Sequence, residues 1–166
     1  VYFILIISSR LLTYLVYKNI FKGYNIKNML IKGGYFMALD GFSISNIIYE
    51  LKNTIIGGRV DKIYQPEKDE IVLQIRNKGN AYKLLLTANA SSPRLHFSNI
   101  QKENPINAPL FCMVLRKHLA SGKIVDITQP NFERIVNIQV ESINELGDYS
   151  IKTLIFEIMG KHSILY

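Results

Sequence analysis

The stretch GGRVDKIYQP, residues 57–66, decides the fold, because its pattern returns as SGKIVDITQP at residues 121–130, an offset of 64 residues. In both stretches a glycine precedes an alternating apolar segment that ends at a Gln-Pro pair. The match continues into the next segment, where the Ile-Val pair at 71–72 recurs at 135–136. These matches predict an internal duplication. A chance coincidence of glycine stops and Gln-Pro corners is the alternative.

Two amphipathic helices precede the repeated stretches. Apolar residues recur at three- and four-residue steps over residues 43–56, where Ser43 is the expected N-cap and the following glycines end the helix. A second helix is expected over residues 109–120, because Pro109 suits a first helical position and Gly122 stops the helix. Each half of the repeat therefore begins with a helix.

Alternating β-type segments bounded by turn residues follow each helix. Each half reads as helix, glycine stop, strand, Gln-Pro corner, strand, hairpin and strand. We therefore predict an α+β fold, a β-sandwich in which two similar sheets pack face to face with a helix attached to each. The expected strands are residues 59–65, 70–76, 81–88, 94–98, 123–128, 132–142 and 149–159.

The composition is that of one compact domain. The chain has 166 residues, of which 48% are hydrophobic, and its 10 Gly and 5 Pro are ordinary numbers. Collagen-like and intrinsically disordered classes are therefore excluded. A disulfide scaffold is excluded as well, because Cys112 is the single cysteine.

The surplus of basic residues is concentrated at the start of the chain. The whole chain has 20 Lys and Arg against 13 Asp and Glu, a formal net charge of +7. Residues 1–36 hold five of the cations and no acid, so residues 37–166 carry 15 cations against 13 acids, a net charge of +2. A net charge of only +2 argues against a domain that wraps many phosphates.

The apolar and basic leader, residues 1–36, is expected to lie outside the domain. Arg10 and then Lys18 interrupt its apolar run, so it falls short of the about 20 residues that a membrane span needs. The triplet at 32–34 can be encoded as a purine-rich ribosome-binding site shortly before Met37. We therefore predict that the leader is untranslated or non-native and that the domain starts at Met37 and is truncated at its C-terminal end. We also predict a cytoplasmic location without a membrane partner.

No catalytic constellation is visible in the sequence. The three histidines show no metal-ligand spacing. Cys112 lies within the apolar string LFCMVL, which is typical of a buried small hydrophobe. Phosphate-cradling glycine loops and nucleophile elbows are lacking from the string. We expect no enzymatic activity, no cofactor and no metal.

Basic residues beside turns and on the second helix are the remaining candidates. Arg116 and Lys117 form a basic tract, and Arg59, Arg134 and Lys161 lie at strand ends or turns. A solvated face is the plain interpretation of such charges. The functional alternative is contact with phosphate, which a guanidinium binds in bidentate fashion.

Six ordered segments together resemble one known family. They are MALDG at 37–41, GGRVDKIYQP at 57–66, LFCMVLRKHL at 110–119, QPNFERI at 129–135, LGD at 146–148 and EIMGKHS at 157–163. This part of the chain resembles the NFACT-N domain of bacterial ribosome-associated quality-control factors, a family also known as fibronectin-binding protein A.

The resemblance implies a fold similar to the N-terminal domain of the formamidopyrimidine DNA glycosylases. The catalytic Pro and Glu of those enzymes are replaced here by Ala38 and Leu39, so glycosylase chemistry is not expected. A repair enzyme would rest on fold analogy alone.

The resemblance also implies function and partners. Members of the family bind the obstructed large ribosomal subunit, recruit alanyl-tRNA and direct the alanine tailing of stalled nascent chains, while the ribosome makes the peptide bond. An adhesin that binds fibronectin or fibrinogen is the alternative.

The family's tRNA-engaging residues match positions of this sequence. A family Asp corresponds to Asp40, and a family Asp-Arg pair corresponds to Glu133 and Arg134, where Glu is one methylene longer. Lys161 stands between Gly160 and His162 where Arg is commoner. The predicted RNA-binding set is Asp40, Glu133, Arg134, Arg59, Arg116, Lys117 and Lys161.

Overall fold

The computed structural model describes residues 39–166 except residues 101 and 145. The predicted leader and the predicted start at Met37 lie outside the described residues. Within the described part of the chain, no helix is long and apolar enough to cross a membrane.

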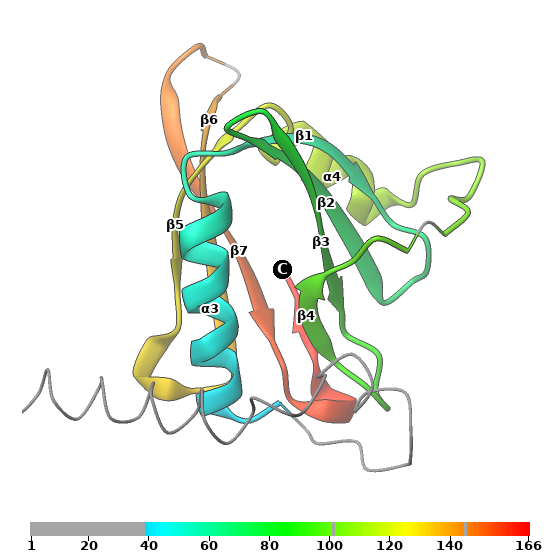
Figure 1. The fold of residues 1–166 in the computed structure, drawn as a ribbon. Helices are drawn as coiled ribbons and strands as arrows, with labels where there is room; N and C mark the ends of the chain where they lie inside the picture. Colours follow the sequence, from blue (N-terminus) through cyan, green and yellow to red (C-terminus); the bar gives the residue numbers. More distant parts are fainter. Residues whose placement is uncertain (1–38, 101, 145) are drawn as a thin grey trace, which may run out of the picture. The chain divides into compact units, whose positions relative to one another are not determined.

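Eight antiparallel strands and two α-helices make up the domain (Figure 1). This is the α+β class expected from the sequence. The helices are α3 (Gly41–Ile55) and α4 (Leu110–Leu119), with two short 3-10 helices, η1 (Pro130–Phe132) and η2 (Gly160–His162). The strands are β1 (Arg59–Tyr64), β2 (Glu70–Asn77), β3 (Asn80–Thr87), β4 (Arg94–Phe97), β5 (Lys123–Thr128), β6 (Ile135–Ile143), β7 (Tyr149–Glu157) and β8 (Ile164–Leu165).

Hydrogen bonding joins all eight strands into a single sheet, in the order β4-β3-β2-β1-β5-β6-β7-β8. The sequence predicts two separate sheets, and the structure corrects this prediction. The difference lies at the centre, where β1 and β5 meet through one registered pair, Arg59 and Lys123. The likeness to the glycosylase N-terminal domain stays a prediction.

The centre of the sheet is two-fold symmetric, as the sequence repeat predicts. Val60 N–H donates to Gly122 O at 2.9 Å, and Ile124 N–H donates to Gly58 O at 2.8 Å. The register of β1 shifts just after Val60 and that of β5 just after Ile124, so the irregularities are also 64 residues apart. The backbones of the two halves therefore share features at the same 64-residue offset as the sequence repeat.

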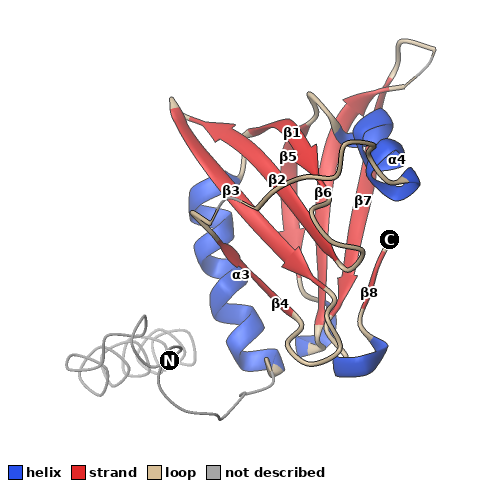
Figure 2. Cartoon of the chain, turned by 90° about the vertical axis from the view of Figure 1, so that its right-hand side faces the viewer, coloured by secondary structure: helices blue, strands red, loops and turns tan. Residues whose placement is uncertain are grey.

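Each helix packs on strands of both halves, and Figure 2 shows the two helices at opposite sides of the strands. Helix α3 precedes β1 in the chain but packs mainly against β5 and β2, whereas α4 precedes β5 but packs against β1 and β6. Both helices and both half-sheets, β1–β4 and β5–β8, contribute to one hydrophobic core. Cys112 is fully buried in this core, as its apolar surroundings predict.

The structure corrects the predicted start of the first helix. Helix α3 begins at Gly41, and its N-cap is Asp40, whose Oδ1 accepts the Ser43 N–H at 2.7 Å. Ser43 is thus the donor to the cap and not the cap itself. The expected strand at 132–142 begins later, at Ile135, because the chain first turns through η1.

Candidate nucleic-acid interface

Four of the seven predicted residues lie at one end of the domain, which we call the α3-start end. Asp40 precedes α3, Glu133 and Arg134 connect η1 to β6, and Lys161 lies in η2. Figures 1 and 2 show the start of α3, η1 and η2 together at this end. The repeat explains the placement, because each half-sheet turns at its Gln-Pro corner and the second corner, Gln129-Pro130, opens η1.

Gln129 ties η1 to the start of α3. Its side-chain Nε2 donates to Gly41 O at 2.7 Å and to Glu133 O at 2.8 Å. A side chain on Gly41 would collide with the Phe132 carbonyl oxygen. The helix start and the turn can therefore approach this closely only because residue 41 is glycine.

The turn itself has an unusual backbone. Asn131 has φ 46° and Phe132 has φ 57°, left-handed values that are costly for a side-chain-bearing residue, above all a bulky one. The Phe132 side chain is nevertheless 68% exposed. An aromatic ring is therefore presented to solvent immediately before Glu133 and Arg134.

Arg134 is held between this turn and η2. Its carbonyl accepts the Ile158 N–H at 2.8 Å, and its Nη2 donates to Met159 Sδ at 3.6 Å. Within residues 39–166, as far as they are described, Arg134 takes part in no ion pair. Arg134 is half-buried, and the thioether that its Nη2 contacts is only a weak acceptor.

The acids of the α3-start end do not neutralise Arg134. Glu133 is exposed and forms no ion pair in the described part of the chain. Asp40 is exposed, and donation from the Ser43 side chain and then from its backbone N–H lowers the pKa of the carboxyl. Asp40 is therefore ionised at neutral pH and oriented by the helix that it caps.

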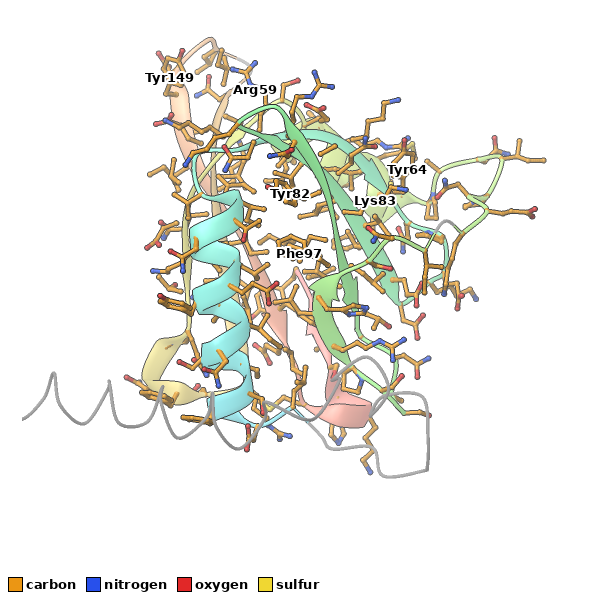
Figure 3. The ribbon with its side chains drawn as sticks, in the orientation of Figure 1. Arg59, Tyr64, Tyr82, Lys83, Phe97 and Tyr149 are labelled. Carbon is orange, nitrogen blue, oxygen red and sulfur yellow. The ribbon has the colours of Figure 1, made fainter. Side chains whose placement is uncertain are left out.

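The other three predicted residues lie elsewhere, so the seven do not form one site. Arg59 is exposed at the end of the domain opposite the start of α3 (Figure 3). Arg116 donates from Nε to Ile63 O at 2.8 Å, a contact that joins α4 to β1. Lys117 follows it on α4 and is exposed. Sequence position alone could not separate these groups, because their separation depends on how the strands and α4 are arranged in space.

Two residues of the α3-start end were missed from the sequence. The sequence marks Gln129 only as part of the repeat and predicts a strand at Phe132. The string QPNF nevertheless indicates a turn, because proline and asparagine favour turns and are uncommon in strands. Among the described residues, no group of three or more His, Cys, Asp or Glu side chains is placed to hold a metal ion.

These features define a class: an antiparallel α+β domain with two-fold related halves, which presents an arginine and an exposed aromatic ring at one end. A model of the family "NFACT N-terminal and middle domains" matches residues 40–165. The chain belongs to this family, as the six sequence segments predicted.

Relatives of known role share the same part of the chain. The Rqc2 homolog RqcH of Bacillus subtilis is 43% identical over 127 residues, which cover 76% of this chain and 22% of the relative. The human ribosome quality control complex subunit NEMF is 26% identical over 119 residues, 72% of this chain and 10% of the relative. The chain therefore spans less than a quarter of the length of these relatives.

A solved structure has the same fold. The N-terminal domain of fibronectin-binding protein PavA from Streptococcus pneumoniae is 44% identical, with a TM-score of 0.74. The match covers 76% of this chain and 48% of that chain. Relatives of this domain thus carry two kinds of name, ribosome quality control and fibronectin binding.

Proposed function

We propose that this chain is an RNA-binding module of a ribosome quality-control factor and that it contacts tRNA through the α3-start end. The observation that carries the proposal is Arg134, a half-buried residue without an ion-pair partner among the described residues, which follows the exposed Phe132 by two positions. Phosphate suits the guanidinium, and an unstacked base suits Phe132. The names of the relatives support the same role.

Within this proposal the acidic residues position the turn and contact the RNA, and they catalyse no reaction. Asp40 fixes the start of α3 and, through Gly41 and Gln129, the turn that bears Arg134. Glu133 accepts hydrogen bonds from ribose hydroxyls or binds cations. Lys161, on the exposed surface of η2, adds one further phosphate contact. A net charge of only +2 over residues 37–166 fits a few such contacts.

The larger protein would supply the remaining functions. We propose that it binds the large ribosomal subunit in the cytoplasm, brings alanyl-tRNA to it and directs alanine tailing, while the ribosome forms the peptide bond. The domain is then a binding module and not an enzyme, and it needs no cofactor.

The test compares two exposed or half-exposed arginines at opposite ends of the domain. Arg134→Ala should weaken tRNA binding by the 166-residue chain, measured by filter retention at fixed salt, whereas Arg59→Ala, with the same loss of charge, should have little effect. Both variants are then placed in a chimera in which residues 40–165 replace the matching part of B. subtilis RqcH. Alanine tailing should fall only with Arg134→Ala. Equal effects of the two variants, or none, would contradict the site.

Adhesion is the second candidate, and the name of the PavA structure is the observation in its favour. It predicts tight binding of immobilised fibronectin that Arg134→Ala leaves unchanged and that salt hardly weakens. A contact made through phosphates loses affinity steeply with salt. The two functions therefore separate in one salt titration of each ligand.

A further inference from the structure

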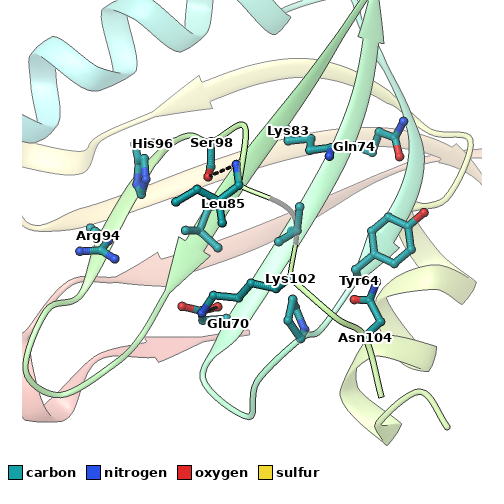
Figure 4. A pocket seen from close by; sticks show the side chains of 13 residues that line it. Tyr64, Glu70, Gln74, Lys83, Leu85, Arg94, His96, Ser98, Lys102 and Asn104 are labelled. Atoms are coloured by element: carbon teal, nitrogen blue, oxygen red, sulfur yellow. Dashed lines mark hydrogen bonds and ion pairs between the residues drawn. The ribbon is translucent and has the colours of Figure 1, made fainter. Parts of the chain in front are cut away.

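The outer face of the β1–β4 half-sheet holds a cavity far along the chain from Arg134. It has a volume of about 290 Å³ and lies between the sheet and residues 98–100 and 102–104, which we call the strap. Figure 4 shows side chains from both sides of this cavity. Its size is at the lower end of small-molecule sites, which suits one compact group.

Strand register orders the floor of the cavity into rows. Each row consists of neighbours paired across β1, β2, β3 and β4. The central row has an aromatic ring at one end, an imidazole at the other and two aliphatic side chains between them: Tyr64, Val72, Leu85 and His96. This row provides a largely apolar surface that crosses four strands.

Cationic residues lie on both sides of the central row. In one neighbouring row Lys83 is paired with Gln74, and in the other Arg94 is paired with Thr87. Within the described residues neither Lys83 nor Arg94 forms an ion pair. Arg94 is exposed and Lys83 half-buried, so both can meet a ligand that rests on the central row.

The strap is fastened over this floor. Lys102 Nζ donates to Glu67 Oε1 at 2.6 Å and to Glu70 Oε2 at 2.7 Å, and these contacts raise the pKa of Lys102. The Ser98 N–H donates to Lys83 O at 2.9 Å. Leu85 is only 8% exposed although it faces away from the core, as expected beneath a strap. The ion pair neutralises Glu70, the acid that lines the cavity.

His96 completes the floor in a neutral form. Burial and then the charge of Arg94 lower the pKa of its imidazole, and the opposing influence of Glu70 is smaller. The ring is therefore uncharged at pH 7, with one donor and one acceptor nitrogen. It can stack on, or hydrogen-bond to, a planar heterocycle.

The second half of the repeat shows what the same backbone looks like without these features. The row that corresponds to Lys62, Gln74 and Lys83 consists of Asp126, Gln139 and Thr153. The central row there contains Asn137 and Ile155, and the row beyond contains Glu157. The symmetry of the fold therefore does not require cations on this face. They are a property of the first half.

We propose that the cavity binds one unpaired nucleotide of a single-stranded RNA, with its base on the Tyr64–His96 row and its phosphates between Lys83 and Arg94. An apolar row with an aromatic ring and an imidazole, flanked by cations, matches the way in which proteins stack single-stranded bases and hold their backbone. The side chains of Gln74, Ser98 and Asn104 line the same cavity and can meet the edge of a base. The inference rests on the proposed function for the source of the RNA, and the nucleotide site itself does not depend on Arg134.

The test follows the imidazole signal of His96 by NMR in the 166-residue chain, with His118 and His162 as internal references. Adenosine monophosphate and a single-stranded oligoadenylate should each shift the His96 signal saturably. Adenosine or inorganic phosphate alone should bind at least about fivefold more weakly, because each lacks either the phosphate or the stacked base. A blunt RNA duplex and a hexaglutamate peptide should leave the His96 signal unmoved.

Matched variants test whether the ligand that shifts the His96 signal binds in the cavity. Lys83→Met and Tyr64→Leu keep much of the side-chain bulk and should weaken oligoadenylate binding about fivefold or more. Lys83→Met should also reduce the salt slope of binding by about one. The control, Lys123→Met, removes a cation from β5 and should change neither value. Unfolding curves identify any variant that is not folded, and Arg94→Gln, at an exposed position, is then the replacement.

Several results would overturn the proposal. They are no shift of His96 with the mononucleotide, equal binding of inorganic phosphate, equal binding of duplex or of the acidic peptide, and equal loss with Lys123→Met. Binding of the mononucleotide but not of the oligoadenylate would overturn the assignment to RNA. Arg134→Ala separates the two proposals, because it should weaken tRNA retention while the mononucleotide still shifts His96.

Discussion

Asp40 is both a predicted RNA-contacting residue and the cap of α3. Its carboxylate accepts the Ser43 N–H at 2.7 Å, and the two donors of Ser43 hold its pKa below the ordinary value. The folded state therefore binds fewer protons than the unfolded state in mild acid. The stabilisation from this carboxylate is complete above the unfolded pKa of about 3.9 and is lost as the pH falls through the lower folded pKa.

Asp40→Asn should flatten the dependence of the unfolding free energy on pH in this acid range. Asparagine keeps an oxygen that can cap the helix but cannot titrate. Denaturant unfolding of the chain at a series of acid pH values measures the slope. Asp40→Ser, another neutral cap, should behave like Asp40→Asn. The same slope for the wild type and both variants would show that the cap does not depend on charge.

Gly41 provides a second test at the level of a single residue. Here a change from glycine to alanine should lower the unfolding free energy, whereas in most helix positions it raises it. Replacement of glycine by alanine in an open helix position stabilises by up to about 1 kcal/mol. Here a Cβ would meet the Phe132 carbonyl oxygen, so Gly41→Ala should destabilise by about 1–3 kcal/mol. Urea unfolding provides the measurement, with Ser45→Ala on the same helix as the control. A more stable Gly41→Ala would mean that the turn and the helix start are not in close contact.

Among the elements, the turn η1 combines strain with exposure. Phe132 has φ 57° and is 68% exposed. Its ring therefore does not contribute to packing of the hydrophobic core. Strained backbone that the surrounding structure holds in place is common at functional sites. The two contributions, conformation and ring, can be separated because glycine and alanine both remove the ring but differ in the cost of a left-handed backbone.

Phe132→Gly should therefore be more stable than Phe132→Ala by roughly 1 kcal/mol. Both variants should retain tRNA equally poorly, because both lack the aromatic surface. Urea unfolding and filter retention, performed on the same preparations, give the two values. If tRNA retention instead followed stability, the ring would not be the contacting group.

Element type was predictable from the sequence, whereas element ends and partners were not. The helix before Gly57 and the strand after it follow from local periodicity. The choice of Asp40 over Ser43 as the cap is connected to the contact between Gly41 and Gln129, 88 positions apart in sequence. Strand β8 has only two residues and too short a pattern to detect.

The candidate sites, too, were predictable only in part from the sequence. Arg134 was found because its neighbourhood resembles a known family, and the structure adds that Arg59 and Arg116 belong to other surfaces. The row that begins at Tyr64 could not be predicted, because it depends on the register of three strand pairs. The register is set by packing across the sheet and is not apparent in any local pattern.

For the domain as a whole, each helix packs on strands of both halves, so neither half completes the hydrophobic core by itself. A chain cut in the strap between Glu103 and Asn104 would leave α3 with β1–β4, although α3 packs largely on β5. We expect fragments 37–103 and 104–166 each to lack a cooperative unfolding transition and to regain one when mixed. Circular dichroism during thermal unfolding is the measurement. An independent transition in either fragment would contradict this dependence.

The paired bonds between Val60 and Gly122 and between Ile124 and Gly58 have a historical consequence. If the halves arose by duplication, a gene that encoded one repeat would have made a polypeptide whose helix packed only in part on its own strands. Two copies, related by a two-fold axis at the β1–β5 pairing, would have completed each other's hydrophobic core. Fusion of the two genes would then have freed each copy to diverge, so that one outer face became basic while the other did not.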